Sequence, residues 1–431
     1  MTDYKVSQYT WLFESDSGSV LYNGYSGALA RLEARNVDTI RDLMNGSRDL
    51  KSLPQKLLEQ LRYGRFVVDK QFDERKVMAM KFGIQNFQLD WLAVTVVVTE
   101  ECNFACPYCY QTSTQKQGVI DPHAIEGYFE YVEAAASNGI RRLMLTLYGG
   151  EPLIYPDTCH LLAGETKMIA EKNDITLRNT MVTNGYLLDE NIEWMLDSEI
   201  SSIQVTIDGP REIHNKRRPL RGGDKGTYDR IVENCREAAE SGLSIVIRVN
   251  VEENVTRRLE DSRLRHENIS VYYEPTRYDH CNNADKYYRN QDFMYNAIQN
   301  QRNHKFSADY LKMRIGGCLA SAFNSFVLLP DGSVVKCWDE VGCDHERNLH
   351  ISDDGFLTEL YHNWIDWNPY LESSQCYICK LLPNCGGGCP YRALNATDSC
   401  CQISEDTLKR LVLQKLMSYD ENDDCEQRQS G

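Results

Sequence analysis

The chain has 431 residues, a formal charge of 47 − 63 = −16 and 16 cysteines. It is long enough for more than one core, because single cores rarely grow beyond about 250–300 residues. The acidic balance disfavours a nucleic-acid partner, since phosphate contacts need Lys and Arg. No window approaches the roughly 18 apolar residues of a membrane helix, and the start of the chain has no apolar signal region. We therefore expect a cytoplasmic protein without a membrane partner.

The cysteines divide this sequence into three regions. None precedes Cys102, three lie between Cys102 and Cys109, and most of the others lie from Cys318 onward. Disulfides are uncommon in the cytosol, so metal ligation or redox chemistry is the expected use of these thiols. The expected domains are 1–88, 89–310 and 311–431.

The region 1–88 shows short strand patterns followed by helical patterns. These patterns predict strands at 9–13 and 19–22, helices at 28–34, 37–44 and 53–61, and a closing strand at 64–68.

The region 89–310 alternates β-branched strand patterns with amphipathic helical patterns. Repeated strand-helix-strand units predict an α/β fold with a parallel sheet and right-handed crossovers. Six such units can form an open barrel or a doubly wound sheet, and periodicity does not choose between them. The expected strands are 92–99, 143–148, 177–183, 202–207, 245–250 and 269–274, and the expected helices are 122–137, 158–171, 190–197 and 228–240.

The region 311–431 is rich in Gly, Pro, Cys and Asn until a helical pattern at 405–417. A hairpin is expected at 326–335, with a turn at Pro330-Asp331-Gly332. It lies between Cys318 and Cys337 and should bring them close together. We expect a loop-rich domain held together by metal ligands.

Cys102, Cys106 and Cys109 directly follow the first strand of the α/β region. Active sites of barrels and open α/β sheets lie at this carboxyl end of the strands. A structural zinc site needs four ligands, and the loop contains no His and no fourth Cys. Three thiolates with one open position fit a 4Fe-4S cluster better.

The loop reads Cys102-Asn103-Phe104-Ala105-Cys106-Pro107-Tyr108-Cys109. It resembles the signature of radical S-adenosylmethionine (radical SAM) enzymes, in which an aromatic residue, here Tyr108, precedes the third cysteine. The resemblance implies that these cysteines hold a catalytic 4Fe-4S cluster that cleaves S-adenosylmethionine (SAM) to a 5'-deoxyadenosyl radical. It also implies a partial (β/α)6 TIM-like barrel.

Motifs at the ends of the later strands resemble the SAM-binding positions of this family. The segment 149–152 resembles the loop that binds the methionine amino group, although an ordinary turn is the alternative. Residues ending the next three strands resemble positions that contact the ribose or the methionine carboxylate. For Arg248 a surface ion pair is the alternative. The candidate cofactor-binding residues are Tyr108, Gly149, Gly150, Glu151, Pro152, Asn184, Thr206, Asp208 and Arg248.

Two further segments near strand ends contain candidate contacts. The basic segment 214–219 has no aromatic residues between its cations, so a solvated or peptide-facing loop is expected there rather than a nucleic-acid surface. Residues at the end of the sixth strand are expected to face the barrel interior or to form a packed aromatic core: Tyr272, Tyr273, Glu274, Tyr278 and Asp279.

The C-terminal cysteines resemble those of a SPASM domain, which carries two auxiliary 4Fe-4S clusters. By this resemblance Cys318, Cys337 and Cys389 hold one cluster, with Cys343 or an open position as the fourth ligand. The ligands of the other cluster are Cys376, Cys379 and Cys385 with Cys401 or Cys400. Cys401 is favoured because a helical pattern follows it. A Cys-x2-Cys pair also suits zinc, so a zinc-stapled interaction module is the alternative from another class.

Residues from about 10 to 85 weakly resemble the small winged-helix peptide-recognition domain of enzymes that mature ribosomally made peptides (RiPPs). The segments 20–29 and 57–67 carry this resemblance. Such domains bind a leader peptide as an added strand. A structural cap on the barrel is the alternative.

Together these resemblances imply a maturase that abstracts hydrogen from a precursor peptide and installs a thioether or carbon-carbon crosslink. They also imply a reductant such as flavodoxin or ferredoxin. The alternatives are a protein maturase of the formylglycine-forming type and a peptide epimerase.

Overall fold

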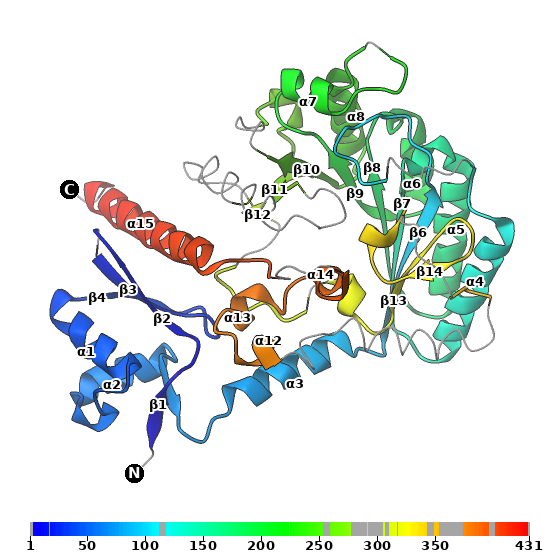
Figure 1. The fold of residues 1–431 in the computed structure, drawn as a ribbon. Helices are drawn as coiled ribbons and strands as arrows, with labels where there is room; N and C mark the ends of the chain where they lie inside the picture. The colour runs from blue at the N-terminus through cyan, green and yellow to red at the C-terminus, as the bar shows by residue number, and fades with distance from the viewer. Residues whose placement is uncertain are drawn as a thin grey trace.

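The α/β fold predicted from the sequence is confirmed in the computed structural model (Figure 1). Tyr278, Asp279, Cys343 and Cys400 lie outside the described residues. The structure describes residues 3–16, 18–111, 118–223, 225–252, 259–276, 291, 305–306, 310–316, 318–342, 349–352, 374–395 and 401–429.

Residues 3–69 contain two small antiparallel sheets and two α-helices among those described. One sheet has the order β2-β3-β4, and the other pairs β1 with β5. Leu21 of the larger sheet packs with Leu43 on the side of the two helices. The elements are β1 (Tyr4–Val6), β2 (Thr10–Ser15), β3 (Gly18–Asn23), β4 (Leu29–Leu32), α1 (Ala34–Met44), α2 (Gln55–Tyr63) and β5 (Val67–Asp69).

The opposite face of this sheet belongs to the main core of the protein. Trp11 and Tyr22 lie in the same buried cluster as Leu408 and Val412 of helix α15 (Glu405–Gln429). Figure 1 shows this last helix lying beside the N-terminal strands. The two ends of the chain therefore pack together.

The helix predicted at 28–34 is wrong, because residues 29–32 form strand β4. They pair with β3, and Leu29 lies opposite Tyr22. The pattern is too short to distinguish a helix from a strand, and β3 offers it backbone partners. A further helix, α3 (Glu74–Asn86), was not predicted.

The main sheet has nine strands in the described part of the chain, in the order β12-β11-β10-β9-β8-β7-β6-β13-β14. The predicted six strands, β6 to β11, are parallel neighbours in sequence order. This order lacks the reversal of a doubly wound sheet and is that of a partial barrel. The strands are β6 (Trp91–Thr99), β7 (Arg142–Gly149), β8 (Thr176–Thr183), β9 (Ile200–Thr206), β10 (Ile245–Val251) and β11 (Ile269–Pro275).

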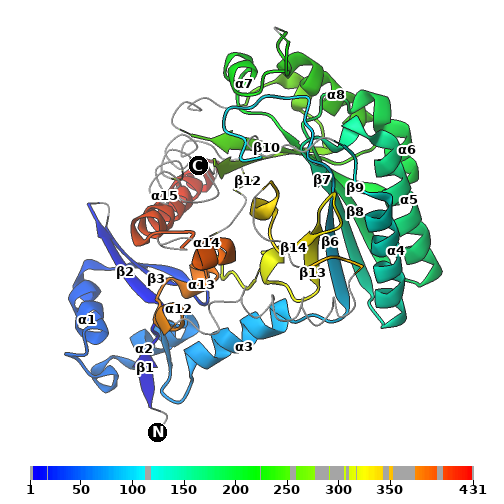
Figure 2. The same cartoon turned by 45° about the vertical axis from the view of Figure 1, so that its right-hand side comes forward.

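Helices cover the outer side of this curved sheet (Figure 2). Val94, Val96 and Val98 of β6 are almost completely buried, as expected for a parallel strand covered on both faces. The carboxyl ends of the strands remain at one edge, where the loops meet. The covering helices are α4 (Pro122–Ser137), α5 (Pro156–Lys172), α6 (Ile192–Asp197) and α8 (Tyr228–Glu240).

The C-terminal region adds strands to the same sheet. The predicted hairpin is confirmed, with β13 (Ser325–Leu328) antiparallel to β14 (Val334–Val335). Strand β13 also pairs in parallel with β6, which places the C-terminal region against the first strand of the barrel. At the other edge is β12 (Lys305–Phe306), and the helices that follow are α12 (Ser374–Ile378), α13 (Leu382–Cys385) and α14 (Pro390–Asn395).

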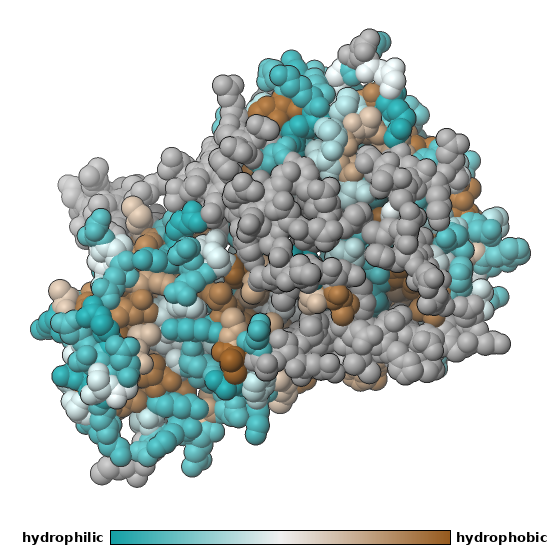
Figure 3. Space-filling model, in the orientation of Figure 1, coloured by the Kyte–Doolittle hydropathy of each residue, from teal (hydrophilic) through white to brown (hydrophobic). Residues whose placement is uncertain are grey.

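No helix among the described residues is long and apolar enough to cross a membrane. On the face drawn in Figure 3, hydrophilic side chains cover much of the N-terminal region, and apolar ones lie between them.

Candidate functional site

The first cysteine loop leaves the carboxyl end of β6 and is held against residues 219–221. The Ala105 N–H donates to the Pro219 carbonyl at 2.9 Å, and the Arg221 N–H donates to the Asn103 carbonyl at 2.7 Å. Burial raises the pKa of Cys102 to about 12. Burial also raises the pKa values of Cys106 and Cys109, and the positive charge of Arg218 acts in the opposite direction on both.

Gly149 and Gly150 allow the end of β7 to touch the backbone that leads into this loop. The Gly150 N–H donates to the Thr99 carbonyl at 2.9 Å, and the Glu151 N–H donates to the Glu101 carbonyl at 2.7 Å. A Cβ atom on Gly150 would lie 2.2 Å from the Glu101 carbonyl oxygen, and one on Gly149 would lie 2.3 Å from that of Thr99. The glycine pair is therefore required for the close approach of two backbones.

The Glu151 carboxylate connects the ends of β7 and β8. It is fully buried, and it accepts hydrogen bonds from Thr183 Oγ1 at 2.7 Å and from the Asn184 N–H at 2.6 Å. Burial raises its pKa, and these donors act in the opposite direction. The next residue, Pro152, begins the 3-10 helix η2 (Pro152–Ile154). Glu151 thus fixes the relative position of two strand ends.

Asn184 extends the same network to the cysteine loop. Its Nδ2 donates to Asn103 Oδ1 at 2.6 Å, and its Oδ1 accepts from the Tyr186 N–H at 2.9 Å. Asn103 lies between the first two cysteines of the loop. The carboxyl end of β8 is therefore tied directly to the candidate cluster loop.

Asp208 and Arg248 connect β9 with β10. Asp208 is fully buried, and it accepts from Arg217 Nε at 3.1 Å and from the Asn250 N–H at 3.2 Å. Thr206 and Arg248 lie opposite each other in the paired strands. Arg248 Nε donates to Asn250 Oδ1 at 2.9 Å.

The basic segment 214–219 is not a solvated loop, although Lys216 is exposed, and the peptide-facing alternative stays a prediction. His214 is fully buried, and Arg217 and Arg218 are each only 8% exposed. Arg217 pairs with Asp208 and Glu252, and Arg218 donates to the Tyr108 hydroxyl at 2.6 Å. These partners come from other strands and from the cysteine loop, and a local charge pattern does not reveal them.

His214 makes folding stability depend on pH. Its Nδ1 accepts the Asp208 N–H at 3.2 Å, its Nε2 lies 3.1 Å from Thr227 Oγ1, and burial lowers its pKa to about 3. The unfolded chain binds a proton at a pKa of about 6.5. The unfolded state therefore holds more protons between these two values.

We expect the free energy of unfolding to decrease as the pH falls from about 6.5 toward about 3. Above about pH 6.5 His214 is neutral in both states, so its titration should not change the free energy of unfolding there. Melting temperatures of the wild type and of His214→Asn, measured between pH 4.5 and 8, will check this. The variant should be less stable at pH 8 and should lose less stability on acidification. An unchanged pH slope would contradict the prediction.

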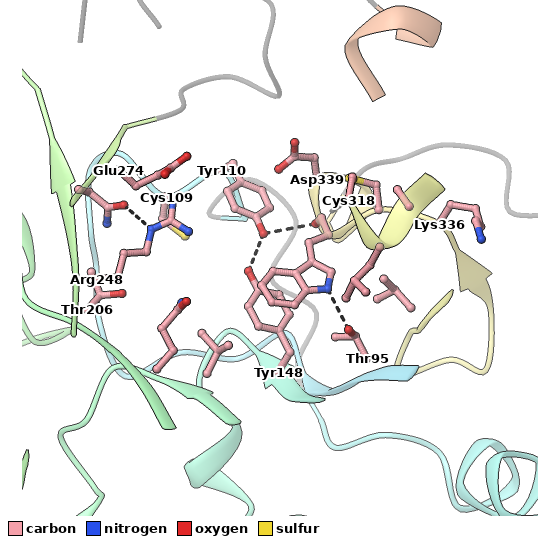
Figure 4. A pocket seen from close by; sticks show the side chains of 18 of the residues that line it. Thr95, Cys109, Tyr110, Tyr148, Thr206, Arg248, Glu274, Cys318, Lys336 and Asp339 are labelled. Carbon is pink, nitrogen blue, oxygen red and sulfur yellow. Dashed lines mark hydrogen bonds between the residues drawn. The ribbon is translucent and has the colours of Figure 1, made fainter. Parts of the chain in front are cut away.

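One cavity of about 430 Å³ contacts both the first cysteine loop and the C-terminal region (Figure 4). Cys109 lines it from the loop, and Cys318 and Cys337 line it from the C-terminal region. Among the predicted cofactor-binding residues, the cavity is lined by Tyr108, Thr206 and Arg248. Glu151, Asn184 and Asp208 hold the surrounding loops in place.

Three aromatic side chains form one wall of this cavity. The hydroxyl oxygens of Tyr110 and Tyr148 are 2.6 Å apart, and the rings of Tyr148 and Trp338 stack with centroids 4.7 Å apart. Trp338 Nε1 donates to Thr95 Oγ1 of β6 at 2.9 Å. The wall therefore contains Tyr110, which follows Cys109, and Trp338, which follows Cys337 (Figure 4).

The second cysteine set is formed by Cys318, Cys337 and Cys389, which pack around Ala320 and Tyr391. Burial raises the pKa of Cys337 well above its usual value, and negative charge on Cys318 and Cys389 adds to this effect. The structure thus brings together three thiols from distant positions, since Cys318 and Cys389 are 71 positions apart in the chain (389 − 318).

The third set is formed by Cys376, Cys379, Cys385 and Cys401. A hydrogen bond with Cys401, and then burial, raises the pKa of Cys385 well above its usual value. Burial also raises the pKa of Cys379, and Cys401 and Cys376 add to the shift. Cys401 therefore lies with the other three.

These thiols have the donor chemistry that iron-sulfur clusters need. Buried thiols favour the protonated form, so a bound metal or a nearby cation must stabilise the thiolate. In the described part of the chain, no three His, Cys, Asp or Glu side chains are placed to hold a single metal ion. The cysteines of the second and third sets lie together in the groups that the SPASM resemblance implies.

Several residues at the cavity were not predicted as site residues. Tyr110, Tyr148 and Trp338 each lie beside a residue of a recognised motif, and this adjacency was the available signal. Arg218 and Lys336 were not predicted because their burial depends on distant segments. Burial lowers the pKa of Lys336 to about 7, whereas Cys318 and Glu340 act in the opposite direction.

Residues 96–260 match the Radical SAM superfamily. The matched segment contains the first cysteine loop and most of the parallel strands of the main sheet. Among curated proteins, GTP 3',8-cyclase of Aliarcobacter butzleri is 29% identical over 165 residues, which is 37% of this chain and 46% of that protein. The cyclase of Sulfurimonas denitrificans is 34% identical over 125 residues, or 28% of this chain and 35% of that protein. The chain thus spans less than half the length of these relatives.

Solved structures share the fold. A structure described as native anSMEcpe with bound AdoMet and Kp18Cys peptide is 20% identical, with a TM-score of 0.57. The match covers 77% of this chain and 99% of that one. A histidine-tagged form of anSMEcpe with bound AdoMet gives a TM-score of 0.56 at 20% identity, over 75% and 95% of the two chains. This likeness extends beyond the radical SAM segment and supports a common architecture.

Proposed function

We propose that this chain is a radical SAM peptide maturase that installs a thioether or carbon-carbon crosslink in a ribosomally made precursor peptide. The cavity carries this proposal, because Cys109 of the first set and Cys318 and Cys337 of the second set line the same space. Its volume of about 430 Å³ lies in the usual range of ligand pockets. A substrate atom in this cavity would face both cysteine sets.

The proposed cofactors are SAM and three 4Fe-4S clusters. Cys102, Cys106 and Cys109 would hold the catalytic cluster, and the second and third cysteine sets would hold the auxiliary clusters. When bound, the catalytic cluster and SAM supply the 5'-deoxyadenosyl radical that abstracts hydrogen. The residues of the chain position the substrate and exclude water, and Thr206 and Arg248 offer donors to a carboxylate.

A peptide is the proposed substrate, and its leader is the proposed partner of the N-terminal region. Two observations support this proposal. A solved structure of the same fold is described with a bound peptide, and the N-terminal sheet has β2 and β4 as its edge strands. An extended peptide can add to such an edge through main-chain hydrogen bonds. The matches to nucleotide cyclases cover about a third of this chain and less than half of those proteins, so they do not carry over a nucleotide substrate.

The proposed crosslink predicts a defined change in peptide mass. The reconstituted enzyme, mixed anaerobically with SAM, a reductant such as flavodoxin or ferredoxin, and the peptide encoded beside its gene, should lower the peptide mass by about 2 Da, the mass of two hydrogens. Tandem mass spectrometry should show no backbone fragments between the joined residues. An unchanged mass would contradict crosslinking.

The alternative reactions give different products in the same experiment. An epimerase leaves the mass unchanged in water and incorporates deuterium from heavy water. A formylglycine-forming enzyme produces an aldehyde that reacts with a hydrazide probe and keeps its backbone fragments. A zinc-stapled module gives a colourless protein that binds no iron.

A further inference from the structure

Lys336 is a buried cation beside the second cysteine set. It is 4% exposed, and it lines the cavity together with Cys318 and Cys337. Its Nζ donates to the carbonyls of Ala322 at 2.8 Å and Ser325 at 2.6 Å. In Figure 4, Lys336 lies on the same side of the cavity as Cys318. These two hydrogen bonds fix the position of the ammonium group.

No carboxylate among the described residues forms an ion pair with this ammonium group. Glu340 is nearby, but its Oε2 accepts the backbone N–H groups of Lys336 at 3.0 Å and Cys337 at 2.9 Å. A buried ammonium group needs an anionic partner, because its desolvation is costly. Besides Glu340, Cys318 of the second set is a neighbouring group that can supply negative charge.

We infer that Lys336 is a positioning residue that compensates the charge of the thiolates of Cys318, Cys337 and Cys389 and raises the reduction potential of the cluster they hold. The inference rests on the proposed function. Thiols must lose their protons to bind iron, which places negative charge in a buried site. The net charge around an iron-sulfur cluster is one determinant of its potential.

The other two sets have a comparable arrangement. The Arg218 guanidinium lies 5.6 Å from the ring of Phe104 and bonds to Tyr108, so it contacts the residues on either side of Cys106. In the third set, Arg314 Nη1 donates to Gln402 Oε1 at 2.8 Å, and the Gln402 N–H donates to Cys385 Sγ at 3.4 Å. Each set therefore has at least one cationic side chain close to its loop.

The test compares Lys336→Gln with Lys336→Arg in the reconstituted full chain. Glutamine keeps two N–H donors without the charge, and arginine keeps the charge. A redox titration monitored by electron paramagnetic resonance should show a lower potential for one auxiliary cluster in Lys336→Gln. We expect the ratio of oxidised to reduced cluster at a fixed potential to rise tenfold. This corresponds to a midpoint potential that is lower by about 59 mV for a one-electron couple. Lys336→Arg should restore the wild-type value.

A second variant keeps the test decisive if Lys336→Gln folds poorly. Asp339 contributes negative charge at Cys337, so Asp339→Asn should shift the same cluster in the opposite direction. Equal potentials in the wild type and Lys336→Gln, with full iron content, would overturn the inference, and a shift in Asp339→Asn would show that the titration detects a lost charge at this cluster. A wild type that binds iron only at the first set would instead contradict the proposed auxiliary clusters, so the two failures are distinguishable.

Discussion

Replacing Cys106 by alanine is expected to abolish SAM cleavage and to remove about four iron atoms per chain. Cys106 lies in the middle of the first cysteine set and is 8% exposed, so few external thiols can replace it. Two thiolates cannot hold a cluster that also leaves a position open for SAM. The measurement is the yield of 5'-deoxyadenosine by liquid chromatography, together with iron content and absorbance near roughly 400 nm.

Cys235→Ala is the matched control for this experiment. Cys235 is fully buried in α8, and burial raises its pKa without a contribution from another cysteine. Its loss should lower stability slightly and leave iron content and 5'-deoxyadenosine formation near wild type. A Cys106→Ala protein that produces 5'-deoxyadenosine at the wild-type rate would refute the assignment of the first set as catalytic.

Replacing Gly150 by alanine is expected to lower the melting temperature by roughly 2–5 °C, which corresponds to about 2–4 kcal/mol. The new methyl group would lie 2.2 Å from the Glu101 carbonyl oxygen, and backbone on both sides must move to relieve this contact. The segment that moves leads directly into Cys102. We therefore expect the variant to lose iron at the first set as well as stability, measured by differential scanning fluorimetry and iron analysis.

Gly164→Ala is the control for a glycine where a methyl group has space. Gly164 lies inside helix α5, and a Cβ atom there meets only His160 Cδ2, at 4.0 Å. Alanine in a helix interior should stabilise the protein by about 0.5–1 kcal/mol. If Gly150→Ala and Gly164→Ala had the same melting temperature and iron content, the close contact of β7 with the cysteine loop would not matter.

Much of the barrel could be predicted because its pattern is local. The six predicted strands correspond to β6 through β11, and the helices predicted at 122–137 and 228–240 have the bounds of α4 and α8. Buried parallel strands read as continuous apolar runs, and amphipathic helices repeat every 3.6 residues. The error at 28–34 arose where the segment was short and its partner strand decided its conformation.

The sequence by itself determined the order of the cysteines, the motifs at the strand ends and the alternation of strands with helices, because these depend on neighbouring residues. The structure places Cys389 with Cys318 and Cys337, as the resemblance implies. Only the tertiary structure decided that one cavity reaches both Cys109 and Cys318. It also decided that Arg218 and Lys336 are buried cations. Burial and charge pairing depend on segments far apart in the chain. Arg218 meets Tyr108 of the cysteine loop, and Lys336 reaches the cavity through the C-terminal hairpin that pairs with the first barrel strand.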